Sequence, residues 1–137
     1  MSVPKSTPTR LITSRQLIAG SLINDMNDAN YSFQSSLAAG VAQADAVAID
    51  AANMEIKAGS ANNAGARLPV AYPGADVNVI NNSANTTIIY ASGTDVIQNA
   101  ATTYAAAAAG VNMATLTSYS FVCIKAGFWQ RAQFLGT

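Results

Sequence analysis

The chain has 137 residues, no histidine, one cysteine, and seven basic and seven acidic side chains, so its formal net charge is zero. Most enzymes that work at neutral pH use a histidine, a tuned carboxylate pair, an activated cysteine or a metal, and this composition supplies few of these groups. A chain of this length forms one domain with a single core. We therefore expect a structural or binding module that is not an enzyme and uses no cofactor.

The N-terminal segment differs in texture from the rest of the chain. Residues 1–10 contain Pro4 and Pro8 and few apolar anchors, which is typical of an extended arm. Over residues 13–27, Ile18, Leu22 and Met26 recur at four-residue spacing, which predicts a short helix. Because Gly20 weakens this helix, an extended arm with apolar anchors is the alternative.

Three basic residues lie in this segment, in a stretch without any acid. Asp25 and further acidic residues follow, so the basic start is able to pair with a neighbouring copy or another partner. The alternative is a solvated tail with scattered charges. The candidate partner-binding residues are Lys5, Arg10 and Arg15.

From residue 46 onwards, short runs of alternating apolar and polar residues predict β-strands. The clearest run places Val77 and Val79 on one face and Asp76 and Asn78 on the other. Loops are expected at 59–65 and 81–85, and a tight hairpin turn at 126–127. The expected strands are 46–50, 54–57, 67–71, 75–80, 86–91, 96–97, 102–106, 113–117, 119–125 and 128–133.

This spacing of strands and turns indicates an all-β fold. It matches the roughly 8–12-residue repeat of sandwiches and barrels, and no βαβ rhythm is present. We expect an antiparallel β-sandwich of jelly-roll type over residues 41–137. Residues 1–40 would form the N-terminal arm, with or without the short helix.

Cys123 and Trp129 are the two single residues whose side chains suit a chemical or binding role. Cys123 lies in an apolar run, which predicts a buried and inert thiol, because no histidine is present to activate it. Trp129 is expected to pack in the core or at its rim, with sugar stacking as the alternative. A glycosidase-type carboxylate pair is improbable, because the acids are scattered singly.

The composition also limits the partners that we expect. No apolar stretch approaches the ~20 residues that cross a bilayer, and no secretory leader is evident, so we expect cytoplasmic synthesis and no membrane contact. The neutral net charge argues against specific nucleic-acid binding. No phosphate-binding glycine loop is present, and no small-molecule substrate is expected.

Three motifs carry a resemblance to a known class of proteins. They are an LP-x-x-x-PG-x-x-V-x-V-x-N strand from Leu68, a Y-x-x-GTD-x-I turn from Tyr90 and an F-V-C-x-x-x-G-x-W hairpin from Phe121. Together they resemble the capsid cement (decoration) proteins of tailed bacteriophages, over residues 67–131. The Ala-rich run at 105–109 and residues 1–40 depart from the pattern.

The resemblance implies a virion protein on the outer surface of the capsid that joins neighbouring capsomers. Its partners would then be the major capsid protein and other copies of itself, with a homodimer favoured over a trimer. The alternative is a phage tail-fibre or receptor-binding module, in which turns such as 81–85 present a sugar-binding surface.

Overall fold

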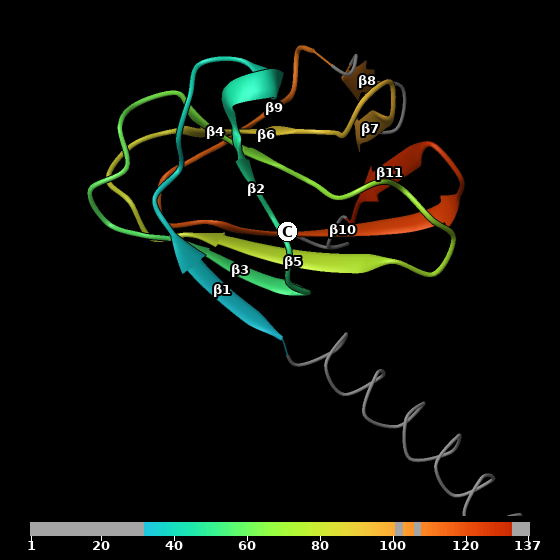
Figure 1. The fold of residues 1–137 in the computed structure, drawn as a ribbon, viewed down its shortest axis with the longest axis horizontal. Helices are drawn as coiled ribbons and strands as arrows, with labels where there is room; N and C mark the ends of the chain where they lie inside the picture. The colour runs from blue at the N-terminus through green and yellow to red at the C-terminus, as the bar shows by residue number, and fades with distance from the viewer. Residues whose placement is uncertain (1–31, 101–102, 106–107, 133–137) are drawn as a thin grey trace, which may run out of the picture. The chain divides into compact units, whose positions relative to one another are not determined.

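The computed structural model describes residues 32–100, 103–105 and 108–132, and these form two β-sheets that pack as a β-sandwich (Figure 1). The larger sheet has the strand order β1 (Phe33–Ser36), β3 (Asn53–Ile56), β5 (Asp76–Asn81), β10 (Ser118–Lys125), β11 (Phe128–Arg131), β7 (Val96–Ala100) and β8 (Thr103–Ala105). The smaller sheet has the order β2 (Val47–Ala48), β4 (Ala64–Arg67), β6 (Thr87–Tyr90) and β9 (Val111–Met113). A single 3-10 turn, η1 (Gln43–Asp45), precedes β2.

The first six strands alternate between the two sheets. Strands β1, β3 and β5 lie in the larger sheet, and β2, β4 and β6 lie in the smaller one. From a strand of one sheet, the chain passes through a strand of the other sheet and then returns, and we call this path one coil. The returning strand lies beside the earlier strand of its own sheet and runs parallel to it. Met54 therefore pairs in parallel register with both Gln34 and Val79. The strand in the opposite sheet serves as the crossover that parallel pairing requires.

This winding corrects the predicted topology. Of the nine strand pairs in the described part of the chain, five are parallel and four are antiparallel. The expected antiparallel arrangement is therefore wrong, and a jelly roll, which is antiparallel, does not describe this strand order. The antiparallel pairs involve the later strands, where β10 pairs with β5 and β11, and β9 pairs with β6.

The core lies between the two sheets, and its largest side chains come from the later strands. Phe121 and Trp129 are fully buried there. Strand β4 consists of small residues before Arg67, and its Ala64 and Ala66 belong to the core. A Cβ on Gly65 would lie 2.7 Å from Cε2 of the Tyr90 ring, so the small residues of β4 allow the chain to approach this ring closely.

Most predicted strands are confirmed, with two displaced. The alternation that buries Met54, Val77 and Val79 is present as expected, and Gly127 forms the predicted hairpin turn with a φ of 81°. The strand predicted at 67–71 lies instead at β4, Ala64–Arg67. The strand predicted at 113–117 ends at Met113, and Leu116 follows in a turn with a φ of 56°.

The sheet framework starts earlier than the expected boundary at residue 41. Strand β1 begins at Phe33 and pairs with β3, so residues 33–36 belong to the larger sheet. The helix predicted over 13–27 lies outside the described residues. Within the described residues, no helix is both long enough and apolar enough to cross a membrane.

The end of β5 carries a buried network of hydrogen bonds around the Asn81 amide, in the region where the sequence predicts a loop. The Asn81 side chain is fully buried, and its Nδ2 donates to the carbonyl oxygens of Asn85 (2.8 Å), Ala114 (3.2 Å) and Met113 (3.3 Å). Its Oδ1 accepts from the backbone N–H and the hydroxyl of Ser83, at 3.0 and 2.7 Å. One side chain thus joins β5, the 82–85 turn and the end of β9.

We expect Asn81→Ala to lower the free energy of unfolding by about 2–4 kcal/mol, because it leaves several buried donors and acceptors without partners. Urea denaturation measures this change. The matched control is Asn82→Ala, whose exposed side chain bonds only the exposed carboxylate of Glu55 and whose loss should stay within about 0.5 kcal/mol. Equal losses in the two variants would contradict the network's role.

Candidate functional site

The three basic residues predicted to bind a partner, Lys5, Arg10 and Arg15, lie outside the described residues. The structure therefore places none of them. The surfaces that the structure does describe are an edge formed by the first coil and a depression on the outer face of the larger sheet.

The described acidic side chains that are hydrogen-bonded serve the local structure. Asp95 Oδ2 accepts a 2.8 Å hydrogen bond from the Ala71 N–H and so ties the loop before β5 to the start of β7. Glu55 accepts from Ser35 Oγ at 2.6 Å and from Asn82 Nδ2 at 2.7 Å. Within the described ranges, no group of three His, Cys, Asp or Glu side chains is placed to hold a metal ion.

Cys123 and Trp129 both belong to the core. Cys123 is buried, and its Sγ lies 3.1 Å from the Lys125 carbonyl oxygen. The buried position predicted for this thiol is confirmed. The Trp129 ring is fully buried, and its Nε1 donates to the Pro69 carbonyl at 3.2 Å. The ring therefore packs in the core and is not available for stacking against a sugar.

The first coil leaves one edge of each sheet without a neighbouring strand in the described part of the chain. Strands β1 and β2 are the outermost strands of the two sheets. Three apolar side chains along this coil are exposed: Phe33 at 66%, Leu37 at 49% and Val41 at 82%. No charged residue occurs between Ser32 and Ala44. We call β1, β2 and the 37–42 connection the first-coil edge.

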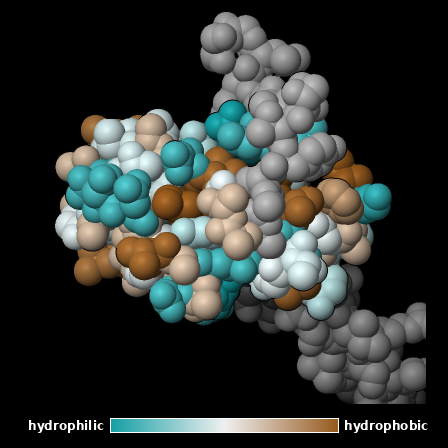
Figure 2. Space-filling view, turned by 90° about the horizontal axis from the view of Figure 1, so that it is seen from above, coloured by the Kyte–Doolittle hydropathy of each residue, from teal (hydrophilic) through white to brown (hydrophobic). Residues whose placement is uncertain are grey.

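Exposed sheet edges are normally protected by charges, prolines, bulges or covering loops. Residues 33–42 contain no charged residue and no proline. Figure 2 shows hydrophobic side chains in several separate groups among polar ones on the face that it presents. At the first-coil edge, three exposed apolar side chains lie along the outermost strands and their connection.

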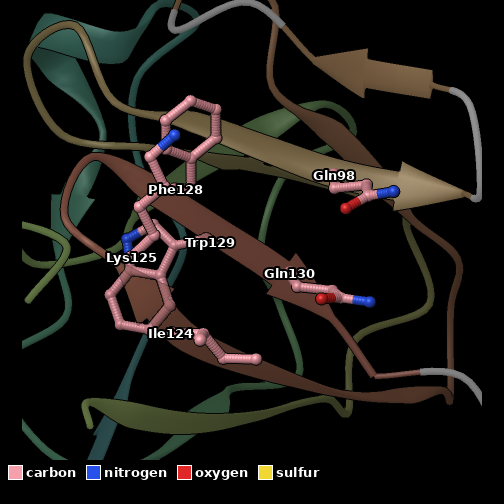
Figure 3. A pocket seen from close by; sticks show the side chains of 6 residues that line it. All are labelled: Gln98, Ile124, Lys125, Phe128, Trp129 and Gln130. Atoms are coloured by element: carbon pink, nitrogen blue, oxygen red, sulfur yellow. The ribbon is translucent and has the colours of Figure 1, made fainter. Parts of the chain in front are cut away.

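A shallow depression of about 320 Å³ lies on the outer face of the larger sheet, over β7, β10 and β11 (Figure 3). The alternation of β11 directs Phe128 and Gln130 outward and Trp129 inward. Gln98 of β7 is the register partner of Gln130. The residues that line the depression are Gln98, Ile124, Lys125, Phe128, Trp129 and Gln130.

The charge of the depression comes from one side chain. Lys125 Nζ lies 4.6 Å from the centroid of the Phe128 ring, within cation–π range. No carboxylate lines the depression. The depression thus offers two carboxamides, one ammonium group, an aromatic ring and an aliphatic side chain.

Sequence reasoning did not single out this group of residues. Gln98 and Gln130 are 32 positions apart, and neither belongs to a recognisable motif. They become neighbours only because β7 and β11 pair in parallel. A correct prediction would have required the pairing partner of each strand, and the alternating pattern carries no such information.

A row of polar side chains crosses the outer face of the larger sheet away from the depression. Ser120 Oγ donates to Asn78 Oδ1 at 2.7 Å, and Asn78 Nδ2 donates to Asn53 Oδ1 at 3.2 Å. In the neighbouring row, Glu55 lies between Ser35 and Asn82. Donors aimed at the charged carboxylate favour its ionised form, so the hydrogen bonds from Ser35 and then Asn82 lower the pKa of Glu55.

Comparisons with known proteins identify no relative: no family model, no curated protein and no solved structure matches the chain significantly.

The pKa of Glu55 provides a direct test of the hydrogen bonds that Ser35 and Asn82 donate to its carboxylate. Because its folded pKa is lowered, its contribution to stability is complete above the ordinary value of 4.5 and is lost as the pH falls through the lowered folded value. We expect an NMR titration of the Glu55 side-chain carboxyl to have its midpoint below 4.5. Ser35→Ala should move the midpoint up more than Asn82→Ala, and Lys57→Gln should move it least. A midpoint unchanged in Ser35→Ala would contradict the assignment.

Proposed function

We propose that this chain is a non-enzymatic virion protein that binds the outside of a tailed-phage capsid and cements neighbouring capsomers. The motifs at 68–81, 90–97 and 121–129 support the virion context through their resemblance to cement proteins. The major capsid protein and further copies of this chain are the partners, with a homodimer favoured and a trimer as the alternative.

The observation that carries the proposal is the first-coil edge. Its backbone groups and its exposed Phe33, Leu37 and Val41 offer a place where an extended segment can add as a further strand. Backbone hydrogen bonds supply affinity in this mode, and the apolar side chains supply register. The edge directly follows residues 1–31, which contain the basic Lys5, Arg10 and Arg15.

A cement role also fits the modest contact that a single copy of the first-coil edge can make. A four-residue strand and three exposed apolar side chains provide a modest contact. On a symmetric lattice, however, many copies act together, because each contact raises the effective concentration of the next. The low net charge limits repulsion between closely spaced copies.

The first test is the location and copy number of this chain in purified particles. We expect cryo-EM density over the head surface and, by quantitative mass spectrometry, a copy number comparable to the number of capsomers. A few copies confined to the tail would instead establish the receptor-binding alternative. Absence of the chain from particles would overturn both.

A capsid-binding assay tests the proposed contact. Phe33→Lys and Leu37→Lys place an ammonium group on the edge, and charges there oppose strand addition. We expect each to weaken binding to chain-depleted particles by about tenfold, which corresponds to about 1.4 kcal/mol. The matched control is Val70→Lys in the loop before β5, because Val70 and Leu37 are equally exposed at 49%.

The same assay tests the N-terminal arm. Deletion of residues 2–12 removes Lys5 and Arg10, and we expect weaker binding with a smaller dependence on salt. Binding and particle stability unchanged by the deletion would exclude the arm from the contact. Binding unchanged in both edge variants would exclude the first-coil edge.

A further inference from the structure

The depression over β7, β10 and β11 has a chemistry that the cement role does not use. Gln98 and Gln130 sit side by side on adjacent strands, where side chains on one face are about 4.8 Å apart. Figure 3 shows both carboxamides extending on the same side of the strands. Each carboxamide provides donors and an acceptor. Gln98 already makes an interaction within the chain, but a carboxamide can make several hydrogen bonds, so the pair keeps capacity to meet neighbouring hydroxyl groups of one ligand.

Apolar surface borders this pair of carboxamides. Ile124 is 77% exposed and Phe128 is 39% exposed, and both line the depression. A ligand that fits must combine hydroxyl groups along its edge with an apolar face. A pyranose ring has this combination, because its C–H bonds form apolar faces and its hydroxyl groups project around the ring.

The same observations exclude other classes of ligand. A cation site would need oxygen ligands such as carboxylates, and none lines the depression. A nucleic-acid site would need a basic face, and Lys125 is the single charged lining residue. The open shape suits one sugar unit of a longer glycan.

We propose that this depression binds a sugar unit of a glycan, with Gln98 and Gln130 bonding its hydroxyl groups and Phe128 and Ile124 contacting its apolar face. Lys125 lies at the depression and is placed to donate to a hydroxyl group or to pair with a carboxylate of an acidic sugar. The sequence-based sugar-stacking alternative concerned Trp129, whose ring is buried; the depression involves different side chains.

The inference is independent of the proposed cement role. In the order of the larger sheet, β1 and β11 are four strand steps apart, a separation of about 19 Å. A copy held through its first-coil edge would therefore keep the depression free. Capsid attachment and glycan binding would then occur on one molecule at the same time.

Side-chain amide signals in NMR spectra of the full chain test the proposal. The probes are maltohexaose and chitohexaose as neutral glycans and hexagalacturonate as an acidic one. We expect at least one probe to shift the NH₂ signals of Gln98 and Gln130 saturably, with a dissociation constant of about 1 mM. Failure of all three probes at about 20 mM, twentyfold above that constant, would overturn the proposal.

Variants connect the signal to the site. Gln130→Ala should weaken binding about fivefold, the effect of losing one or two hydrogen bonds, because the side chain is exposed and its loss leaves the fold intact. The matched control is Asn112→Ala, an exposed carboxamide on β9 of the other sheet, which should change nothing. Binding that survives both Gln98→Ala and Gln130→Ala would overturn the proposal.

Two further measurements separate the ligand classes and the two functions. Loss of hexagalacturonate binding in Lys125→Gln would assign the site to acidic sugars, and retained maltohexaose or chitohexaose binding in that variant would assign it to neutral ones. Gln130→Ala should bind capsids normally, so a failure of glycan binding is distinguishable from a failure of the cement role.

Discussion

The alternation of the chain between the two sheets is the constraint on which the rest of the structure depends. A strand that is followed by a strand in the opposite sheet cannot form a hairpin with it. When the chain returns, the next strand lies parallel to the one before the crossing, as in β1, β3 and β5. This winding stacks the first coils against one another. On the core face of β4 the side chains are those of Ala64 and Ala66, and both are small.

The two ends of this stack differ. After the third coil, β10 pairs antiparallel with β5, and β9 pairs antiparallel with β6. Asn81 fastens this closure, because its amide bonds backbone groups of the 82–85 turn and of the segment after β9. At the opposite end, β1 and β2 are the outermost strands of their sheets, and no described strand pairs with their outer edges. Stacked repeats generally need a cap at each end, and the proposed capsid contact would supply one at the first coil.

The alternating pattern of the sequence predicts the faces of strands well and their neighbours poorly. The prediction that Val77 and Val79 share one face is confirmed, and that face is buried, since a period of two residues requires only local information. The same pattern is produced by a hairpin and by a coil, so the parallel pairing of β3 with β5 was missed. Asn81 was assigned to a turn on composition. Its burial depends on carbonyl groups more than thirty residues away, at Met113 and Ala114.

The depression and the first-coil edge illustrate this same limit. The edge could be anticipated in part, because an uncharged run from Ser32 to Ala44 is visible in the sequence. The pairing of Gln98 with Gln130 could not, because it arises from a parallel contact between β7 and β11. An edge offers backbone groups and favours a protein strand, whereas a sheet face offers only side chains and favours a ligand that those side chains select. The aromatic ring, the two carboxamides and the ammonium group on this face are the basis for proposing a hydroxyl-rich ring as its ligand.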